Sequence, residues 1–265
     1  MIDYDGQVAL VTGGASGIGR ALALALAARG ARVLVADIDG DGAAATAAQA
    51  GGAALQVDLA EPGAATGLLD RAWGLAGKVD FIASNAGMGS GPGPKRLLKA
   101  DLDAPRVAAM FEVNMFAAIR LAQAYVPRLD AAGRRGRLMI TGSENSLSMP
   151  DAVQSFGLGL YAASKHGVLV LAEWLRAECT GGGKPLDVHV LLPGGVYTGM
   201  TADGLGPDPA GWPVDMHIIT PDRCAQIALA GLDAGLFWIP THRHLVGDMG
   251  PRYVGVAEAV RVLGL

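Results

Sequence analysis

Two residues of this sequence, Tyr161 and Lys165, have types and a spacing suited to acid–base chemistry. They open an apolar, helix-favouring run, and residues four apart lie on one helix face about 5–6 Å from each other. A free tyrosine has a pKa of about 10. A unit positive charge about 5 Å away, at an effective dielectric of about 20, would lower that pKa by roughly two units. The pair therefore suits proton transfer near neutral pH, although the same spacing also arises by chance on ordinary helix surfaces.

The segments that would position this pair alternate between strand-like and helix-like patterns. Short apolar, β-branched runs occur at 7–12, 32–37, 53–58, 79–84, 136–142 and 186–192, and helix-favouring runs at 41–50, 62–76, 104–131 and 159–180. Strands that are apolar on both faces, each followed by a helix, predict an α/β fold with a doubly wound parallel sheet. No internal repeat or linker divides the chain, so residues 1–265 are predicted to form a single domain.

Composition argues against several classes of protein. The net charge is −4 and no stretch concentrates Lys or Arg, so a nucleic-acid partner is not expected. No uninterrupted apolar run reaches about 18 residues and Met1–Asp5 is acidic, so we expect no membrane span or signal peptide and a cytoplasmic location. Cys179 and Cys224 have no paired spacing, and reduced thiols are favoured over a disulfide. His242 and His244 lack a metal-ligand pattern, so we predict a solvated loop there and no metal site.

A glycine-rich turn follows the first predicted strand. Gly13, Gly17 and Gly19 form the pattern G-x-x-x-G-x-G, whereas the common fingerprint G-x-G-x-x-G fits in no register. Glycines between a strand and a helix let the backbone turn tightly and let a diphosphate reach the N–H groups of the helix N-terminus. Ser16 and Ile18 lie in the same turn, and we predict that all five residues bind a dinucleotide.

Acidic residues end the second and third predicted strands. Asp37 is placed to hold both ribose hydroxyls of the adenosine, or alternatively to cap the next helix. Its carboxylate would repel a 2′-phosphate, and neither Ala15 nor Ser16 is basic, so NAD is favoured over NADP. Asp58 and Leu59 are placed for the adenine amino group, with the same alternative.

The fourth predicted strand ends in small residues. Asn85, Ala86 and Gly87 leave room there for the cofactor ribose and let backbone groups point inward. The glycine- and proline-rich segment 88–94 follows, and we expect it to form a mobile rim of the site.

These motifs together resemble the classical short-chain dehydrogenase/reductase family over essentially the whole chain. The matching elements stand in the family's order: residues 12–19, Asp58–Leu59, Asn85–Gly87, Asn114, Ser143, Tyr161–Lys165 and Pro193–Thr198. The resemblance implies a Rossmann-type fold of about seven strands, a nicotinamide cofactor, and hydride transfer between a small-molecule alcohol and a ketone. It also implies a homodimer or homotetramer, for which the long helices at 104–131 and 159–180 would supply the contact.

The resemblance also assigns roles to individual residues. Tyr161 would act as the acid–base group, and Lys165 would lower its pKa and bind the nicotinamide ribose. Asn114 would hold a water that relays protons away from Lys165, although a buried asparagine can also simply bend or cap a helix. Pro193, Gly194 and Val196 would lie along the nicotinamide, with the Thr198 hydroxyl on its carboxamide.

The serine that would bind the substrate oxygen is less clearly defined by the sequence. Ser143 follows a predicted strand, as the family pattern requires, but 18 residues separate it from Tyr161, more than is usual in the family. We therefore predict an inserted loop over the pocket at 149–158, and Ser146 and Ser148 remain alternatives to Ser143.

Substrate choice is expected to depend on a lid at 199–219. Met200, Trp212 and Ile218 are among its apolar residues and favour an apolar or aromatic secondary alcohol. The segment 239–244 resembles that of family members acting on hydroxysteroids and benzylic alcohols, which implies a hydroxysteroid-like or benzylic substrate. A sugar or polyol dehydrogenase of the same family is the alternative. A non-catalytic NAD-binding regulator would not need Ser143, Tyr161 and Lys165 together, and an epimerase would carry a larger C-terminal region.

Overall fold

The computed structural model describes residues 1–89, 91, 97–149, 157–212, 214 and 217–265. Within them, seven strands form one sheet in the order β3-β2-β1-β4-β5-β6-β7, and every neighbouring pair is parallel. The strands are β1 (Val8–Thr12), β2 (Arg32–Asp37), β3 (Ala53–Gln56), β4 (Phe81–Ser84), β5 (Gly136–Thr141), β6 (Leu186–Leu192) and β7 (Trp238–Pro240). The predicted doubly wound parallel sheet is confirmed.

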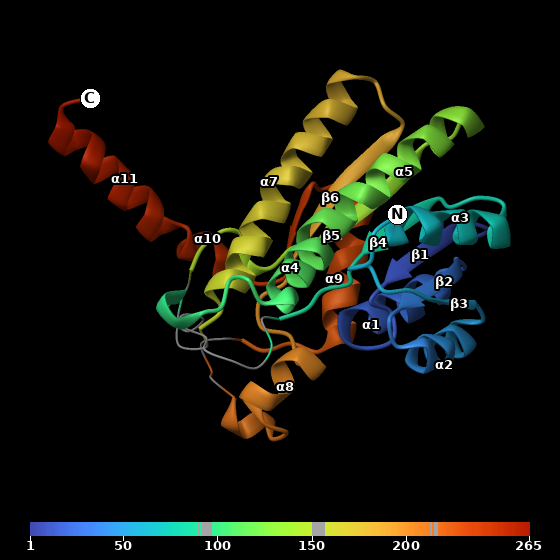
Figure 1. The fold of residues 1–265 in the computed structure, drawn as a ribbon, viewed down its shortest axis with the longest axis horizontal. Coiled ribbons are helices and arrows are strands. Elements are labelled where there is room, and N and C mark those ends of the chain that lie inside the picture. The colour runs from blue at the N-terminus through green and yellow to red at the C-terminus, as the bar shows by residue number, and fades with distance from the viewer. Residues whose placement is uncertain (90, 92–96, 150–156, 213, 215–216) are drawn as a thin grey trace.

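Helices cover both faces of this sheet (Figure 1). One face packs on α1 (Gly17–Ala27), α2 (Gly40–Ala50) and α9 (Pro221–Asp233), and the other on α3 (Ala64–Ala76), α5 (Ala117–Ala132) and α7 (Gly159–Gly181). All five residues of β1 are buried, because alternate side chains enter the core on opposite faces. Leu10, for example, packs toward α3 and α5, whereas Val11 packs toward α1.

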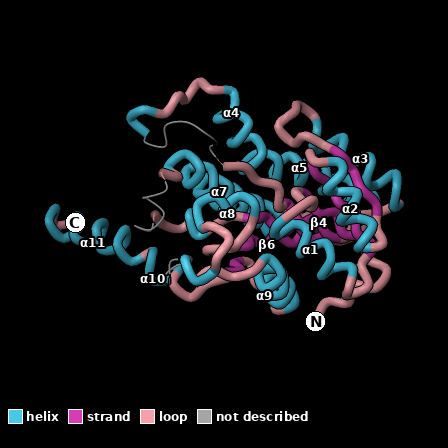
Figure 2. Tube along the Cα trace, turned by 90° about the horizontal axis from the view of Figure 1, so that it is seen from below, coloured by secondary structure: helices cyan, strands magenta, loops and turns pink. Residues whose placement is uncertain are grey.

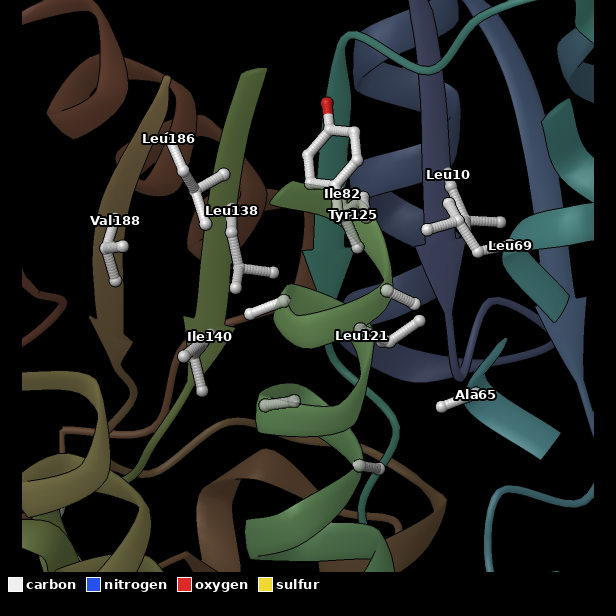
Figure 3. Close-up of a cluster of buried hydrophobic side chains, with 14 of the residues drawn as sticks. Leu10, Ala65, Leu69, Ile82, Leu121, Tyr125, Leu138, Ile140, Leu186 and Val188 are labelled. Atoms are coloured by element: carbon white, nitrogen blue, oxygen red, sulfur yellow. The ribbon is translucent and has the colours of Figure 1, made fainter. Parts of the chain in front are cut away.

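The core beneath α5 fixes the centre of the sheet (Figure 3). Leu121 and Tyr125 of α5 lie against Leu10, Ile82 and Leu138, which come from β1, β4 and β5. The Tyr125 hydroxyl donates a 2.8 Å hydrogen bond to the Val79 carbonyl, so this buried phenol has a partner. The packing holds β1 and β4 side by side, which matters for the site described below.

The predicted long helix at 104–131 is one helical run with an irregular middle. It consists of α4 (Pro105–Phe111), a π-helical turn η2 (Glu112–Phe116) and α5. By length and composition alone, Pro105–Ala132 is apolar enough to cross a membrane, contrary to the prediction from sequence; its most apolar stretch is 33% buried, and a single such helix is weak evidence for a membrane span. Here the run packs against α3 and α7. π-helical turns often mark functional positions, and this turn carries Asn114.

Shorter elements surround the carboxyl edge of the sheet. They are η1 (Leu97–Lys99), η3 (Glu144–Ser146), α8 (Gly199–Leu205), η4 (Pro209–Gly211) and α10 (Leu245–Asp248). The last helix, α11 (Gly250–Leu263), projects away from the body (Figures 1 and 2) and has no buried residue. Its exposed apolar residues include Tyr253, Val254, Val256, Val260, Val262 and Leu263.

A buried aspartate ties the amino end of β1 to the loop before β5. Asp80 is 7% exposed and accepts a 2.8 Å hydrogen bond from the Val8 N–H. It also pairs with Lys78 at 3.1 Å and with Arg134. Burial alone would raise the pKa of Asp80, but the Val8 N–H and the two cations together hold it below its usual value.

Replacing Asp80 by Asn should lower the free energy of unfolding by about 1–3 kcal/mol at neutral pH, since charge-assisted hydrogen bonds are lost. Because the folded-state pKa is depressed, this stabilisation is present above the usual aspartate pKa and is lost as pH falls through the folded value. Urea unfolding of both proteins across this pH range measures the difference. Asp130→Asn, at an exposed pair with Lys184, is the control. Equal stability of Asp80→Asn and the parent at neutral pH would contradict the assignment.

Candidate active site and nucleotide-binding cleft

The strand order reverses between β1 and β4, and a ligand cleft is expected outside their carboxyl ends. Thr12, the last residue of β1, links the two strands. Its hydroxyl accepts hydrogen bonds from the N–H groups of Asn85 and Ala86 at 3.0 and 3.1 Å. The Asn85 amide in turn donates to the carbonyls of Thr12 and Gly13 at 3.3 and 3.4 Å. We had not singled out Thr12; the available signal was a polar residue closing an apolar strand.

The glycine turn leaves space in front of α1. A Cβ on Gly19 would lie 2.0 Å from the Gly13 carbonyl oxygen, and one on Gly13 would lie 2.8 Å from the Ala86 Cα. Gly13 and Gly17 also have positive φ values of 65° and 53°, which favour glycine. No described side chain caps α1 at Ser16, so the first N–H groups of the helix remain available. These features fit a diphosphate at a helix N-terminus.

A cleft of about 410 Å³ runs from this turn to α7. Every predicted site residue except Gly19 and Asn114 lines it: Gly13, Ser16, Gly17, Ile18, Asp37, Asp58, Leu59, Asn85, Ala86, Gly87, Ser143, Tyr161, Lys165, Pro193, Gly194, Val196 and Thr198. Val113, Thr141 and Gly142 also line it and were not predicted. The structure thus brings residues from the carboxyl ends of β1 to β6, and from α7, to one cavity.

Asp37 lines the cleft at the end of β2. It accepts hydrogen bonds from the N–H groups of Ala15 at 2.9 Å and Asp39 at 3.0 Å. The cap of α2 is Asp39, whose side chain accepts from the Gly42 N–H. The alternative of a capping role therefore belongs to Asp39, and Asp37 is left lining the cleft. Asp58 lines the cleft too, while its side chain accepts from the Ala60 N–H at 2.9 Å.

Tyr161 and Lys165 share one face of α7, as predicted. The Lys165 Nζ lies 5.8 Å from the centroid of the Tyr161 ring and donates a 2.8 Å hydrogen bond to the Thr141 carbonyl. Lys165 is only 3% exposed. The carbonyl at the end of β5 thus holds the ammonium beside the phenol.

Burial dominates the proton affinities of this pair. It raises the pKa of Tyr161 to about 12; the hydrogen bond with Ser143 lowers that value and the Glu144 charge raises it. Burial also lowers the pKa of Lys165 to about 8. The predicted lowering of the tyrosine pKa by Lys165 is therefore not seen in the protein alone: the pKa is raised, and Ser143 is the residue that lowers it. A further positive charge in the cleft, such as an oxidised nicotinamide ring, would favour the phenolate.

Of the three candidate serines, Ser143 lines the cleft and hydrogen-bonds Tyr161, and neither Ser146 nor Ser148 lines it. Ser143 is the N-cap of η3, and its hydroxyl accepts from the Asn145 N–H at 3.2 Å. The Ser146 hydroxyl accepts from the Ser143 N–H at 3.1 Å and so supports Ser143 from behind. Residues 150–156 of the predicted inserted loop lie outside the described residues.

Asn114 uses its side chain to join two loops. Its Oδ1 accepts from the Met88 N–H at 2.8 Å, and its Nδ2 donates to the Met88 carbonyl at 2.9 Å and to the Ser164 hydroxyl at 3.1 Å. These bonds attach the segment after β4 to α7, one residue before Lys165. The predicted part of Asn114 in proton transfer remains a prediction.

The predicted nicotinamide turn follows β6. The Pro193 carbonyl accepts from the Glu144 N–H at 2.7 Å, and the Gly194 N–H donates to the Thr241 hydroxyl at 3.1 Å. Thr198 then begins α8, where its N–H donates to the Thr201 hydroxyl at 2.9 Å. The turn is therefore fixed to both the serine loop and the C-terminal segment.

The segment after β7, which carries His242 and His244, is less exposed than predicted. His242 is 8% exposed, so the prediction of a solvated loop is wrong at this position. The described residues contain no group of three or more His, Cys, Asp or Glu placed to hold a metal ion. Cys179 and Cys224 are both buried and free, as predicted.

Comparison with known proteins agrees with this geometry. The family model for short chain dehydrogenase matches residues 7–205. The chain is 38% identical over 252 residues to 1-deoxy-11-beta-hydroxypentalenate dehydrogenase of Streptomyces avermitilis, covering 93% of this chain and 88% of that protein.

Solved structures give the same result for the fold. A short-chain dehydrogenase/reductase from Burkholderia phymatum in complex with NAD superposes with a TM-score of 0.83 at 24% identity, covering 98% of this chain and 97% of that one. A short-chain dehydrogenase from Sphingobium yanoikuyae in complex with NADPH gives 0.72 at 26% identity, covering 97% and 94%. The chain belongs to the short-chain dehydrogenase family. It is a nucleotide-binding oxidoreductase acting on hydroxyl or keto groups.

Replacing Gly19 by Ala should weaken nicotinamide-nucleotide binding at least about tenfold, since the new Cβ overlaps the Gly13 carbonyl and disturbs the turn. Calorimetric titration with NAD and NADP measures the change, and circular dichroism checks the fold. Gly67→Ala is the matched control, because Gly67 is also helical and a Cβ there meets nothing within 4 Å. Unchanged affinity in Gly19→Ala would contradict the assigned cradle.

Proposed function

We propose that this protein interconverts a secondary alcohol and a ketone with NAD, using Tyr161 as the acid–base group. The observation that carries this proposal is one cleft in which Ser143, Tyr161 and Lys165 lie together beyond a glycine turn suited to a dinucleotide. Family membership supplies the reaction class, and the arrangement of these side chains supports the roles assigned to them.

Each residue has a distinct task in the proposed reaction. The bound nicotinamide supplies the hydride chemistry. Tyr161 takes the proton of the alcohol hydroxyl during oxidation and returns it during reduction. Ser143 donates a hydrogen bond to the substrate oxygen and stabilises the charge that develops there. Lys165, held by the Thr141 carbonyl, keeps its ammonium beside the phenol and near the cofactor ribose. Asn114 keeps the loop after β4 in register with α7.

An experiment on Tyr161 distinguishes this proposal from the alternative of a non-catalytic NAD-binding protein. Tyr161→Phe should reduce turnover of alcohols to the background rate, because it removes the proposed proton acceptor. NAD affinity should change by less than about threefold, since the ring is retained. Steady-state assays at the nicotinamide absorbance and calorimetric titration measure the two quantities. Turnover that survives in Tyr161→Phe would refute the catalytic role.

The preference for NAD over NADP rests on Asp37. Its carboxylate lines the adenosine end of the cleft, and the neighbouring Ala15 and Ser16 offer no cation to a 2′-phosphate. Similar structures hold NAD in one case and NADPH in another, so the fold alone does not decide the preference.

Asp37→Ser should raise the ratio of NADP to NAD efficiency at least about tenfold, because it removes both the ribose contact and the repulsion of the phosphate. Initial rates with both cofactors over a range of concentrations give this ratio. Asp39→Asn is the control, since it removes a charge two residues away and keeps the α2 cap. A parent enzyme that prefers NADP would refute the role proposed for Asp37.

We propose an apolar, alicyclic or aromatic substrate. Met88, Val113 and Met200 line the cleft near the catalytic end, and Trp212 stacks on Tyr197 at 4.7 Å in the segment proposed as a lid, 199–219. The name of the relative from Streptomyces avermitilis indicates a hydroxypentalenate, which fits an alicyclic alcohol. A sugar or polyol remains the alternative, and a panel of hydroxysteroid, benzylic and polyol substrates distinguishes them.

We also propose self-association through the long helices. Phe116 on η2 is 41% exposed, and Val170 and Trp174 on α7 are 51% and 64% exposed. Exposed apolar side chains on two packed helices suit a contact with a second copy. Sedimentation of the intact protein would distinguish a homodimer or homotetramer from a monomer. The cytoplasmic location remains a prediction.

A further inference from the structure

A buried carboxylate follows the proposed substrate-binding serine directly. Glu144 is 8% exposed, although it is the first residue of η3 beside the cleft. Its N–H donates to the Pro193 carbonyl at 2.7 Å, so its backbone connects the serine loop to the nicotinamide turn. A carboxylate is rarely buried unless it is paired, because leaving water costs the charged form several kcal/mol. The side chain therefore requires a partner.

That partner comes from the far end of the chain. The His244 Nε2 lies 3.0 Å from the Glu144 carboxylate, across 100 residues of sequence. The Asp248 carboxylate lies 3.9 Å from the same nitrogen. Further titratable rings near the pair are His242 and His217, 5.2 and 6.1 Å from His244 between ring centroids. Tyr161 faces Glu144 from α7, and its pKa is raised by the Glu144 charge.

The segment that carries His244 also contacts the nicotinamide turn and the lid. A Cβ on Gly194 would lie 2.6 Å from the His242 ring and 3.1 Å from the Glu144 carboxylate, so the turn packs directly on both. The His242 Nε2 lies 2.9 Å from the His217 carbonyl. His217 has a φ of 46°, a strained value for a residue with a side chain. One short segment thus touches the three loops that surround the reacting atoms.

The pair is well placed to act on both catalytic groups. Ser143 is adjacent to Glu144 and caps the same turn, so a shift of the carboxylate moves the serine hydroxyl that hydrogen-bonds Tyr161. The His244 Nε2, 3.0 Å from the Glu144 carboxylate, holds that carboxylate in place beside Ser143. Neither Glu144 nor His244 lines the cleft, so they would act through Ser143 and Tyr161 without touching the substrate.

We propose that Glu144 and His244 are positioning residues for the proposed reaction: the buried pair fixes Ser143 against Tyr161 and sets the field in which the phenol ionises. The inference rests on the proposed function of Tyr161. Glu144→Gln keeps the shape of the side chain and removes its charge. His244→Gln keeps an N–H donor, whereas His244→Phe removes it.

Three results are expected from steady-state kinetics over a pH series. The rate of alcohol oxidation should rise with pH as Tyr161 ionises. In Glu144→Gln this rise should occur about half a unit to one unit lower in pH, because the negative charge that opposes the phenolate is gone. His244→Phe should lower kcat about tenfold or more with the KM for NAD unchanged, and His244→Gln should restore much of that loss. The double variant Glu144→Gln/His244→Phe should lose less than the product of the single losses, as expected for coupled residues.

Glu178→Gln is the charge control. Glu178 is exposed on the same helix as Tyr161, 17 residues further along, or about 25 Å away. The proposal would be overturned if the pH dependence of the oxidation rate is unchanged in Glu144→Gln, or if it shifts equally in Glu178→Gln. So would equal activity in His244→Phe and His244→Gln.

A second readout separates failure of this inference from failure of the proposed function. Tyrosinate absorbance can be titrated with NAD bound, taking each protein minus its Tyr161→Phe counterpart, and no turnover is required. Glu144→Gln should lower the pKa of Tyr161 in this titration even if no tested alcohol is oxidised. An unchanged phenol pKa would reject the inference alone, whereas a lowered pKa in a protein that oxidises nothing would reject the proposed function alone.

Discussion

The Thr12 hydroxyl, which accepts the N–H groups of Asn85 and Ala86, is the interaction on which the site depends. It fixes the end of β1 to the end of β4 where the strand order reverses. Parallel strands place all their carboxyl ends at one edge, but the loops that follow lack the backbone hydrogen bonds that join the strands. Here the Thr12 side chain provides hydrogen bonds between β1 and the chain just beyond the end of β4. The glycine turn and the loop carrying Gly87 consequently face each other at a fixed separation.

The catalytic end of the cleft is organised by desolvation. Lys165 is buried and Tyr161 is half-buried, and desolvation drives both toward their neutral forms, with pKa values of about 8 and 12. At neutral pH these values leave the phenol protonated and Lys165 mostly an ammonium. A positive ring stacked on the turn after β6 would reverse this balance for the phenol, because an opposite charge in a low dielectric acts strongly. In the proposed reaction the tyrosine would thus be a poor base without cofactor and a better one with it, which would couple proton transfer to hydride transfer.

Much of this could be predicted from sequence because the determinants are local. A strand followed by glycines, an acid at a strand end and a tyrosine four residues before a lysine are each readable within a few positions. The structure confirms the sheet and places nearly all of these residues on one cleft. What could not be predicted depends on contacts between distant segments. The Glu144–His244 pair spans 100 residues, and the π-helical turn at Asn114 has no signature in the helix-favouring pattern.

His242 shows why its environment was misjudged. A histidine between polar neighbours in a turn-rich tail reads as exposed, and local composition gives no reason to think otherwise. Yet β7 pairs with β6, so the residues after it emerge beside the nicotinamide turn and are buried there. The position of the C-terminal segment is therefore a consequence of sheet topology.

Two parts of the site differ in how the fold supports them. Residues at strand ends are placed by the register, whereas the proposed lid, 199–219, is held outside the sheet by contacts such as the Val196–Ile219 bridge and the His217 carbonyl to His242. Chemistry that must stay constant suits the first kind of support, and substrate choice, which differs among relatives, suits the second.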